Sequence, residues 1–241
     1  MTTIALAAPR TTGDVLQLHF LQVGLWLVRP LLVMAFAFVV TAVIAAVFWR
    51  LGSLPGSGEW VETSRNNPAM FWALPGLLGY LGVQMVSLTF PIALSLGTTR
   101  RAFIFGTLLT QASIAAYIAA VLLVLLLIEV STGHWFVDLY VIDVNILGAG
   151  DPLRLLMIAF LGTLLVLSMG AAFSAAWVRF GTAGPMALLA GSIVSLGLIA
   201  FAVAPVIAST FEPWWLVAAA VTMIALSAAA QYLCLLRASV R

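Results

Sequence analysis

Six long apolar runs with little charge inside them constrain the fold of this chain more than any other feature. Hydrophobic residues make up 64% of its 241 residues and charged residues 7%, against about 45–50% and about 25% in soluble domains. A spanning helix needs about 20 apolar residues, and the segments between the runs are far shorter than a typical soluble domain of roughly 100 residues. We therefore expect an all-α integral membrane protein, folded as one transmembrane domain over residues 1–241.

The runs predict six transmembrane helices preceded by an interfacial helix. Residues 1–28 hold a cytoplasmic tail and the interfacial helix, which Arg29-Pro30 separates from the first span. The second run is about 42 Å long by helical rise and contains Pro75 and Pro91, which predicts a kinked helix that projects beyond the bilayer. A polar loop is expected at 59–67. The spans are predicted at 30–48, 69–96, 102–128, 155–177, 185–207 and 214–236.

The positions of the charged residues predict the orientation in the membrane. The chain has ten Arg and no Lys, and basic residues favour cytoplasmic loops. Residues 129–151 contain four acids and no Lys or Arg, so we expect this segment to be external and both termini to be cytoplasmic. All the acids except Asp14 then lie outside. Seven arginines are cytoplasmic (Arg10, Arg29, Arg100, Arg101, Arg179, Arg237 and Arg241) and three external (Arg50, Arg65 and Arg154).

The residues needed for intramembrane chemistry do not occur at workable positions in the predicted spans. Proton relays require ionisable side chains within the membrane, and hydrolysis requires a nucleophile with a base or a pair of carboxylates. His19 and His134 are expected on opposite sides, and with Cys234 they form no metal-binding pattern. We expect solvated or hydrogen-bonded histidines, no catalytic residue, no metal and no cofactor in this chain. If the chain transports anything, its energy should come from another subunit.

The short segment of Gly97, Thr98, Thr99, Arg100 and Arg101 is the place where such a subunit could act. It joins two long predicted helices on the cytoplasmic side. Arginine pairs at span ends are also routine topological anchors, so the residues alone leave both interpretations open.

The flanking sequence favours coupling to a partner. Residues 90–107, with the pattern Ser-x-Gly-x-Thr-Arg-Arg-x-Phe before the third span, resemble small bacterial type-two ATP-binding-cassette (ABC) permeases. The leading interfacial helix and the six spans are similar to that family as well. The position of Leu96 often holds Glu in the family.

The resemblance implies how such a subunit would work. The segment 97–101 would dock on a separate ABC ATPase subunit that binds ATP and Mg, and a second permease chain would complete a homodimer or heterodimer. The implied location is the bacterial plasma (inner) membrane, and the implied function is membrane-spanning permease subunit of an exporter. No nucleic-acid partner is expected. The alternatives are the substrate-binding membrane component of an ATP-driven vitamin uptake system and a non-transporting assembly factor.

Polar side chains within the spans have two possible roles. Gln84, Ser87, Thr110 and Gln111 could line a translocation path, and Gln231 on the sixth span belongs with them. Hydrogen bonds between helices are the commoner use of such residues. Small residues four apart predict helix contacts in two further spans, at Gly170 with Ser174 and at Gly191 with Ser195.

Overall fold

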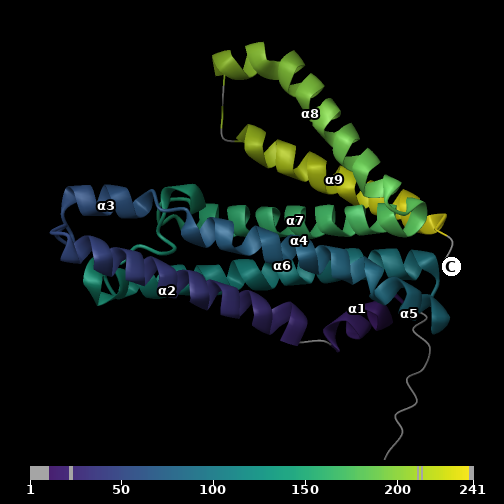
Figure 1. Ribbon diagram of the computed structural model, residues 1–241, viewed down its shortest axis with the longest axis horizontal. Helices are drawn as coiled ribbons and strands as arrows, with labels where there is room; N and C mark the ends of the chain where they lie inside the picture. Colours follow the sequence, from purple (N-terminus) through teal and green to yellow (C-terminus); the bar gives the residue numbers. More distant parts are fainter. Residues whose placement is uncertain (1–10, 22–23, 211, 213, 239–241) are drawn as a thin grey trace, which may run out of the picture. The chain divides into compact units, whose positions relative to one another are not determined.

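The computed structural model describes residues 11–21, 24–210, 212 and 214–238, and within the helix that begins at Ala183 it leaves the side chains at 196, 199–200 and 202–210 undescribed. Every regular element in this part of the chain is helical (Figure 1). The long elements are α2 (Arg29–Arg50), α4 (Ala69–Ser87), α6 (Arg100–Ser131), α7 (Pro152–Phe180), α8 (Ala183–Thr210) and α9 (Trp214–Leu236). The short ones are α1 (Thr12–Phe20), η1 (Gly24–Val28), α3 (Gly58–Arg65), α5 (Thr89–Ser95), η2 (His134–Asp138) and η3 (Asn145–Leu147).

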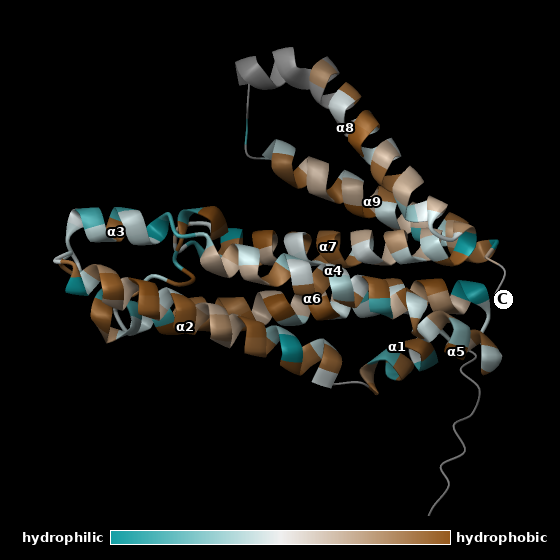
Figure 2. Cartoon of the chain, in the orientation of Figure 1, coloured by the Kyte–Doolittle hydropathy of each residue, from teal (hydrophilic) through white to brown (hydrophobic). Residues whose placement is uncertain are grey.

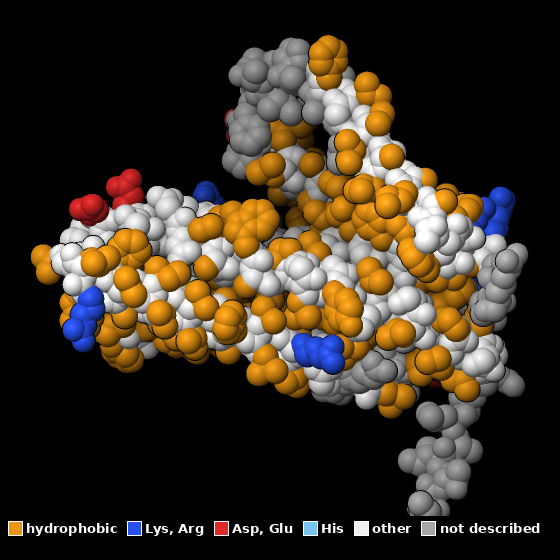
Figure 3. Space-filling model, in the orientation of Figure 1, with side chains coloured by type: hydrophobic (Ala, Val, Ile, Leu, Met, Phe, Trp, Pro, Cys, Tyr) orange, Lys and Arg blue, Asp and Glu red, His pale blue; other side chains and the backbone are white. Residues whose placement is uncertain are grey.

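Among the residues that the structure describes, five helical segments are long and apolar enough to cross a membrane: Gly24–Arg50, Gly58–Ser95, Arg100–Ser131, Pro152–Phe180 and Trp214–Leu236. The all-helical, multi-pass membrane character expected from the sequence is therefore confirmed. The predicted span at 185–207 falls within α8, which is a shorter apolar helix over the part with described side chains, Ala183–Ser195. Figure 2 shows the apolar character of the long helices, and Figure 3 shows hydrophobic side chains over the visible face of α2.

The N-terminal region differs from the predicted interfacial helix. A capping box between Thr11 and Asp14 starts α1, which ends at Phe20. Residues 22–23 lie outside the described part. Helical backbone is present again from Gly24, so Arg29-Pro30 does not separate two helices. The π-helical turn of η1 precedes Pro30 because proline has no N–H to complete an α-helical bond and its ring crowds the preceding turn.

The second predicted span is divided near Pro91 and is continuous at Pro75. Helix α4 runs through Pro75 and ends at Ser87, and the seven-residue α5 follows from Thr89. Pro91 cannot donate a hydrogen bond to the carbonyl of Ser87, four residues earlier, which accounts for a break at this place.

Two other boundaries also differ from the prediction. The expected polar loop at 59–67 is mostly helix α3, because the Ser57 side chain accepts the Trp60 N–H and caps its first turn. Helix α6 continues three residues beyond the predicted end of the third span, so Glu129 lies in its last turn rather than in a loop.

The chain divides into two units, and α4, α6 and α7 each contribute residues to both. Unit 1 contains the described residues of Met1–Leu21, Gly79–Gln111 and Leu165–Arg241, and unit 2 those of Gln22–Leu78 and Ala112–Leu164. The core of unit 1 includes Phe90 and Phe103, whose rings meet edge to face with centroids 5.1 Å apart.

Glycines bring α4 and α7 into backbone contact within unit 1. A Cβ added to Gly82 would lie 2.3 Å from the Leu167 carbonyl oxygen, and one added to Gly170 would lie 2.3 Å from the Gly79 oxygen. The predicted helix contact at Gly170 is therefore confirmed. No described atom lies within 4 Å of a Cβ added at Gly191, so the helix contact predicted there stays a prediction.

Candidate functional site

Residues 88–101, which we call the elbow, contain Leu88, helix α5, the turn that follows it and the first two residues of α6. The N–H of Gly97 donates to the Leu94 carbonyl (2.9 Å) and that of Thr98 to the Ala93 carbonyl (3.0 Å). These two bonds are a Schellman motif, and Gly97 has the positive φ of 84° that the motif favours in glycine. The glycine thus closes α5 and turns the chain toward α6.

The next residues of the elbow start α6. Thr99 acts as the helix cap, because its hydroxyl accepts the Ala102 N–H (3.2 Å). Arg100 is half-buried, and its Nη1 donates to the Leu236 carbonyl at the end of α9 (2.6 Å). Cationic groups at helix C-termini are stabilising. Arg100 therefore joins the elbow to α9, whereas Arg101 is exposed.

Three apolar side chains of the elbow are exposed along one side of α5. Leu88, Ile92 and Leu96 are four residues apart and are 51%, 51% and 37% exposed. Side chains at this spacing share one side of a helical segment, so they form a ridge, which we call the elbow ridge. With Arg101 at the start of α6, the exposed surface of the elbow combines apolar side chains with a positive charge.

Three of the predicted polar residues bond within their own helices. Gln84 bonds to Tyr80 one turn earlier on its own helix, Ser87 bonds to the Val83 carbonyl, and Thr110 bonds to the Gly106 carbonyl. Thr110 and Gln111 are completely buried. The structure therefore gives Gln84, Ser87 and Thr110 local contacts, and the role of all four residues in a translocation path stays a prediction.

Gln111 instead pairs with Gln231 from α9. Its Nε2 donates to the Gln231 Oε1 (3.2 Å), and the Gln231 Nε2 donates to the Ser168 carbonyl of α7 (3.1 Å). The two glutamines therefore link three helices of unit 1, which is the packing role that commonly accounts for amides in membrane helices.

Both histidines make polar contacts. In unit 1, His19 is buried, with its Nε2 3.3 Å from the Thr107 hydroxyl. Burial lowers its pKa to about 4, because the charged imidazolium loses hydration. In unit 2, the His134 Nε2 lies 3.0 Å from the Asp143 Oδ2.

Glu129 organises the loop after α6 in unit 2. Its carboxylate is completely buried and accepts the N–H groups of Val141 (3.1 Å), Ile142 (2.8 Å) and Asp143 (3.1 Å), as well as the Trp135 indole N–H (3.1 Å). Consecutive backbone N–H groups directed at one anion form a nest. The sequence did not predict this nest, because Glu129 was assigned to an acidic external loop.

Asp143 extends the cluster to α3. It is also buried, and its Oδ2 accepts from the Arg65 guanidinium at 2.7 Å. The Arg65 guanidinium lies over the Tyr140 ring, 5.4 Å from its centroid. Burial raises the pKa of the Tyr140 phenol, although the nearby Arg65 charge acts in the opposite direction. At neutral pH this side chain is therefore a neutral hydroxyl.

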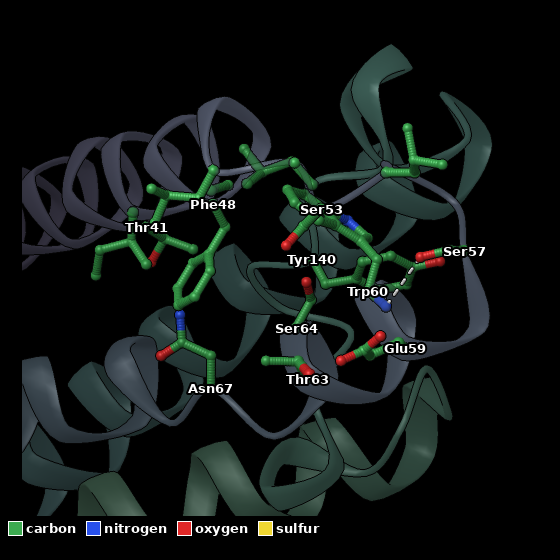
Figure 4. Close-up of a pocket in the computed structure, with 16 residues that line it drawn as sticks. Thr41, Phe48, Ser53, Ser57, Glu59, Trp60, Thr63, Ser64, Asn67 and Tyr140 are labelled. Carbon is green, nitrogen blue, oxygen red and sulfur yellow. Dashed lines mark hydrogen bonds between the residues drawn. The ribbon is translucent and has the colours of Figure 1, made fainter.

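A cavity of about 640 Å³ lies in unit 2, between the end of α2, helix α3 and the residues Leu139 and Tyr140 (Figure 4). Its apolar wall includes Ile44, Ala45 and Phe48 from α2. Its polar wall includes Ser53 and, on α3, Glu59, Thr63 and Ser64. The volume falls within the range of sites for small organic ligands. This cavity was not predicted from the sequence, because its walls come from a helix end and from a segment predicted to be a loop.

No cluster of three His, Cys, Asp or Glu side chains that could hold a metal ion occurs in the part of the chain that the structure describes. A comparison of the chain with known protein families, with characterised proteins and with solved structures finds no match.

Proposed function

We propose that the chain is the membrane-spanning permease subunit of an ATP-driven exporter, energised by a separate ABC ATPase that binds ATP and Mg. It crosses the bacterial plasma membrane six times, with α8 as the fifth span and both termini in the cytoplasm. A second permease chain completes the transporter. The elbow is the docking surface for the ATPase.

The construction of the elbow carries this proposal. A surface that transmits movement must be rigid, and the Schellman motif and the Thr99 cap hold the chain at both sides of Gly97. It must also reach the helices that move, and the elbow connects directly to α6 and, through Arg100, to the end of α9. Finally, it must present a surface to a partner, which the elbow ridge and Arg101 supply.

The charge pattern supports a cytoplasmic elbow. On the six-span topology, seven arginines face the cytoplasm and three face outward, and the acids other than Asp14 lie outside. The buried carboxylate of Glu129, at the opposite end of α6 from the elbow, is fully engaged in four hydrogen bonds. It thus serves the loop rather than a proton pathway.

Of the two arginines of the elbow, Arg101 is the better position for testing this proposal. Arg100 bonds to α9, so its removal would disturb folding as well as docking, whereas Arg101 is exposed. We therefore compare Arg101→Glu with Arg237→Glu, which changes the same charge at another exposed position near the end of α9. A misplaced charge at an interface costs up to several kcal/mol.

The tagged chain is purified from its native cells in mild detergent, and membrane insertion and co-purified ATP hydrolysis are measured. Insertion should be equal in the two variants. Arg237→Glu should retain the co-purified ATPase and Arg101→Glu should lose most of it, by about tenfold or more. Equal recovery of the ATPase with the two variants would show that Arg101 is only a topological anchor. Recovery of an unrelated membrane complex without ATPase would favour an assembly factor.

A further inference from the structure

The cavity of unit 2 has one charged side chain in its lining. Among the described residues that form its walls, this is Glu59, in the first turn of α3. Arg65 lies on the same helix but is not part of the lining, and its guanidinium is bound to Asp143. An anion entering the cavity would therefore meet a carboxylate without a compensating cation, whereas a cation would be attracted to it.

The polar wall has hydrogen-bonding groups available for a ligand. Within the described structure, no hydrogen bond occupies the side chains of Glu59, Ser53, Thr63 or Ser64. Some other polar side chains of the lining are already engaged. The Thr41 hydroxyl donates to the Ala37 carbonyl and the Trp60 indole N–H to the Asp138 carbonyl, and the side chains of Ser57 and Asn67 accept backbone N–H groups at helix starts. The available groups therefore include a carboxylate and three hydroxyls, all of which can accept hydrogen bonds.

The remaining wall is apolar. It is formed by α2 side chains, including Ile44 and Phe48, together with Leu51 and Leu54. In Figure 4, Phe48 and Thr41 lie on one side of the view, and Ser53, Ser64, Thr63 and Glu59 lie on the other. A ligand that matches both walls has an apolar body and a head that donates hydrogen bonds and carries positive charge.

We infer that this cavity binds a small protonated amine with an apolar body, with the ammonium at Glu59 and the apolar part against the α2 wall. An ammonium offers up to three donors to the carboxylate and the hydroxyls, and charge-assisted bonds of this kind are the stronger ones. The site is a property of unit 2 alone and does not depend on the ATPase partner.

The test compares three probes that share a phenyl ring and four methylenes but differ in charge: phenylbutylamine, phenylbutanol and phenylpentanoate. The full chain is placed in lipid nanodiscs, and binding is measured by equilibrium dialysis with empty nanodiscs subtracted. The amine should bind saturably, about three- to tenfold more tightly than the alcohol, and the carboxylate should bind most weakly.

Variants on α3 separate the site from partition into the lipid. Glu59→Gln should reduce amine affinity to about that of the alcohol and should leave alcohol binding unchanged, which also shows that the variant is folded. Glu62→Gln removes an exposed charge from the same helix outside the lining and should bind all three probes as the native chain does. Non-saturable amine binding, or equal loss in the two variants, would overturn the inference.

Discussion

The interactions that stabilise unit 1 internally differ from those that stabilise unit 2. In unit 1, α4 and α7 touch at Gly82 and Gly170, where the contact leaves no space for a side chain. In unit 2, a loop with five non-glycine residues at positive φ is fixed by the carboxylates of Glu129 and Asp143. The difference teaches that regular helices satisfy their own backbone and need only close packing, whereas an irregular segment needs buried polar groups to satisfy its backbone.

The largest predicted effect on stability comes from replacing the buried carboxylate of Glu129 in unit 2. Glu129→Gln replaces one acceptor oxygen by an N–H donor that faces backbone N–H groups, so we expect unfolding to become easier by about 3 kcal/mol. The loop at 132–150 should become sensitive to protease. Glu62→Gln, which changes an exposed glutamate on α3, is the matched control. Equal stability of the two variants in denaturant titration would show that the nest does not hold the loop.

The corresponding test for unit 1 is Gly82→Ala. The added methyl group would overlap the Leu167 carbonyl, so the helices must separate, at a cost of about 2 kcal/mol. Gly76→Ala on the same helix meets no described atom within 4 Å and should be neutral or slightly stabilising. Thermal unfolding in one detergent compares them, and a neutral Gly82→Ala would remove the proposed close contact.

His19 makes unit 1 depend on pH in spite of its apolar core. The folded pKa of about 4 lies below the ordinary 6.5, so the unfolded or undocked form takes up the proton first. Stability present above pH 6.5 is therefore lost as the pH falls toward 4, by about 2 kcal/mol at pH 5. Hydrogen exchange of α1 amides should accelerate over this range. His19→Gln should abolish that pH dependence, and its persistence would assign it to another group.

The smallest predicted effect concerns the amide pair of unit 1. Gln111→Leu removes the bond to Gln231, and the loss should be about 1 kcal/mol, since polar pairs in membrane proteins have modest energies. A double-mutant cycle with Gln231→Leu measures the coupling between the two side chains. An absence of coupling, together with impaired transport in Gln111→Leu, would favour the translocation-path interpretation.

The sequence predicted the helical, multi-pass character and the place of the elbow because both depend on local patterns. Runs of apolar residues predict spans wherever they occur, and the glycine and threonine of the elbow have direct roles as helix-ending and helix-starting residues. The division of the second span could also have been placed at Pro91, since the proline and the carbonyl that it leaves unbonded are only four residues apart.

The parts that the sequence did not predict depend on contacts between distant residues. Helix α3 has few apolar residues, so its hydropathy resembled that of a loop, although Ser57 was a cap signal. Glu129 and the residues at 141–143 are separated by a loop whose path no local rule supplies. The cavity likewise requires α2 and α3 to be side by side with Tyr140. The charge pattern therefore placed Glu129 and residues 141–143 in an acidic loop and left their contacts unknown.

The most direct test of the proposed function is photochemical crosslinking from the elbow ridge. A photoreactive amino acid replaces Ile92 in the tagged chain, the native cells are irradiated, and the adducts are identified by mass spectrometry. Val124, which is 54% exposed within α6, is the control position for a side chain away from the elbow. The proposal predicts that Ile92, but not Val124, forms an adduct with a chain that carries an ATP-binding P-loop motif. An Ile92 that crosslinks only to lipid, or that gives the same adducts as Val124, would contradict it.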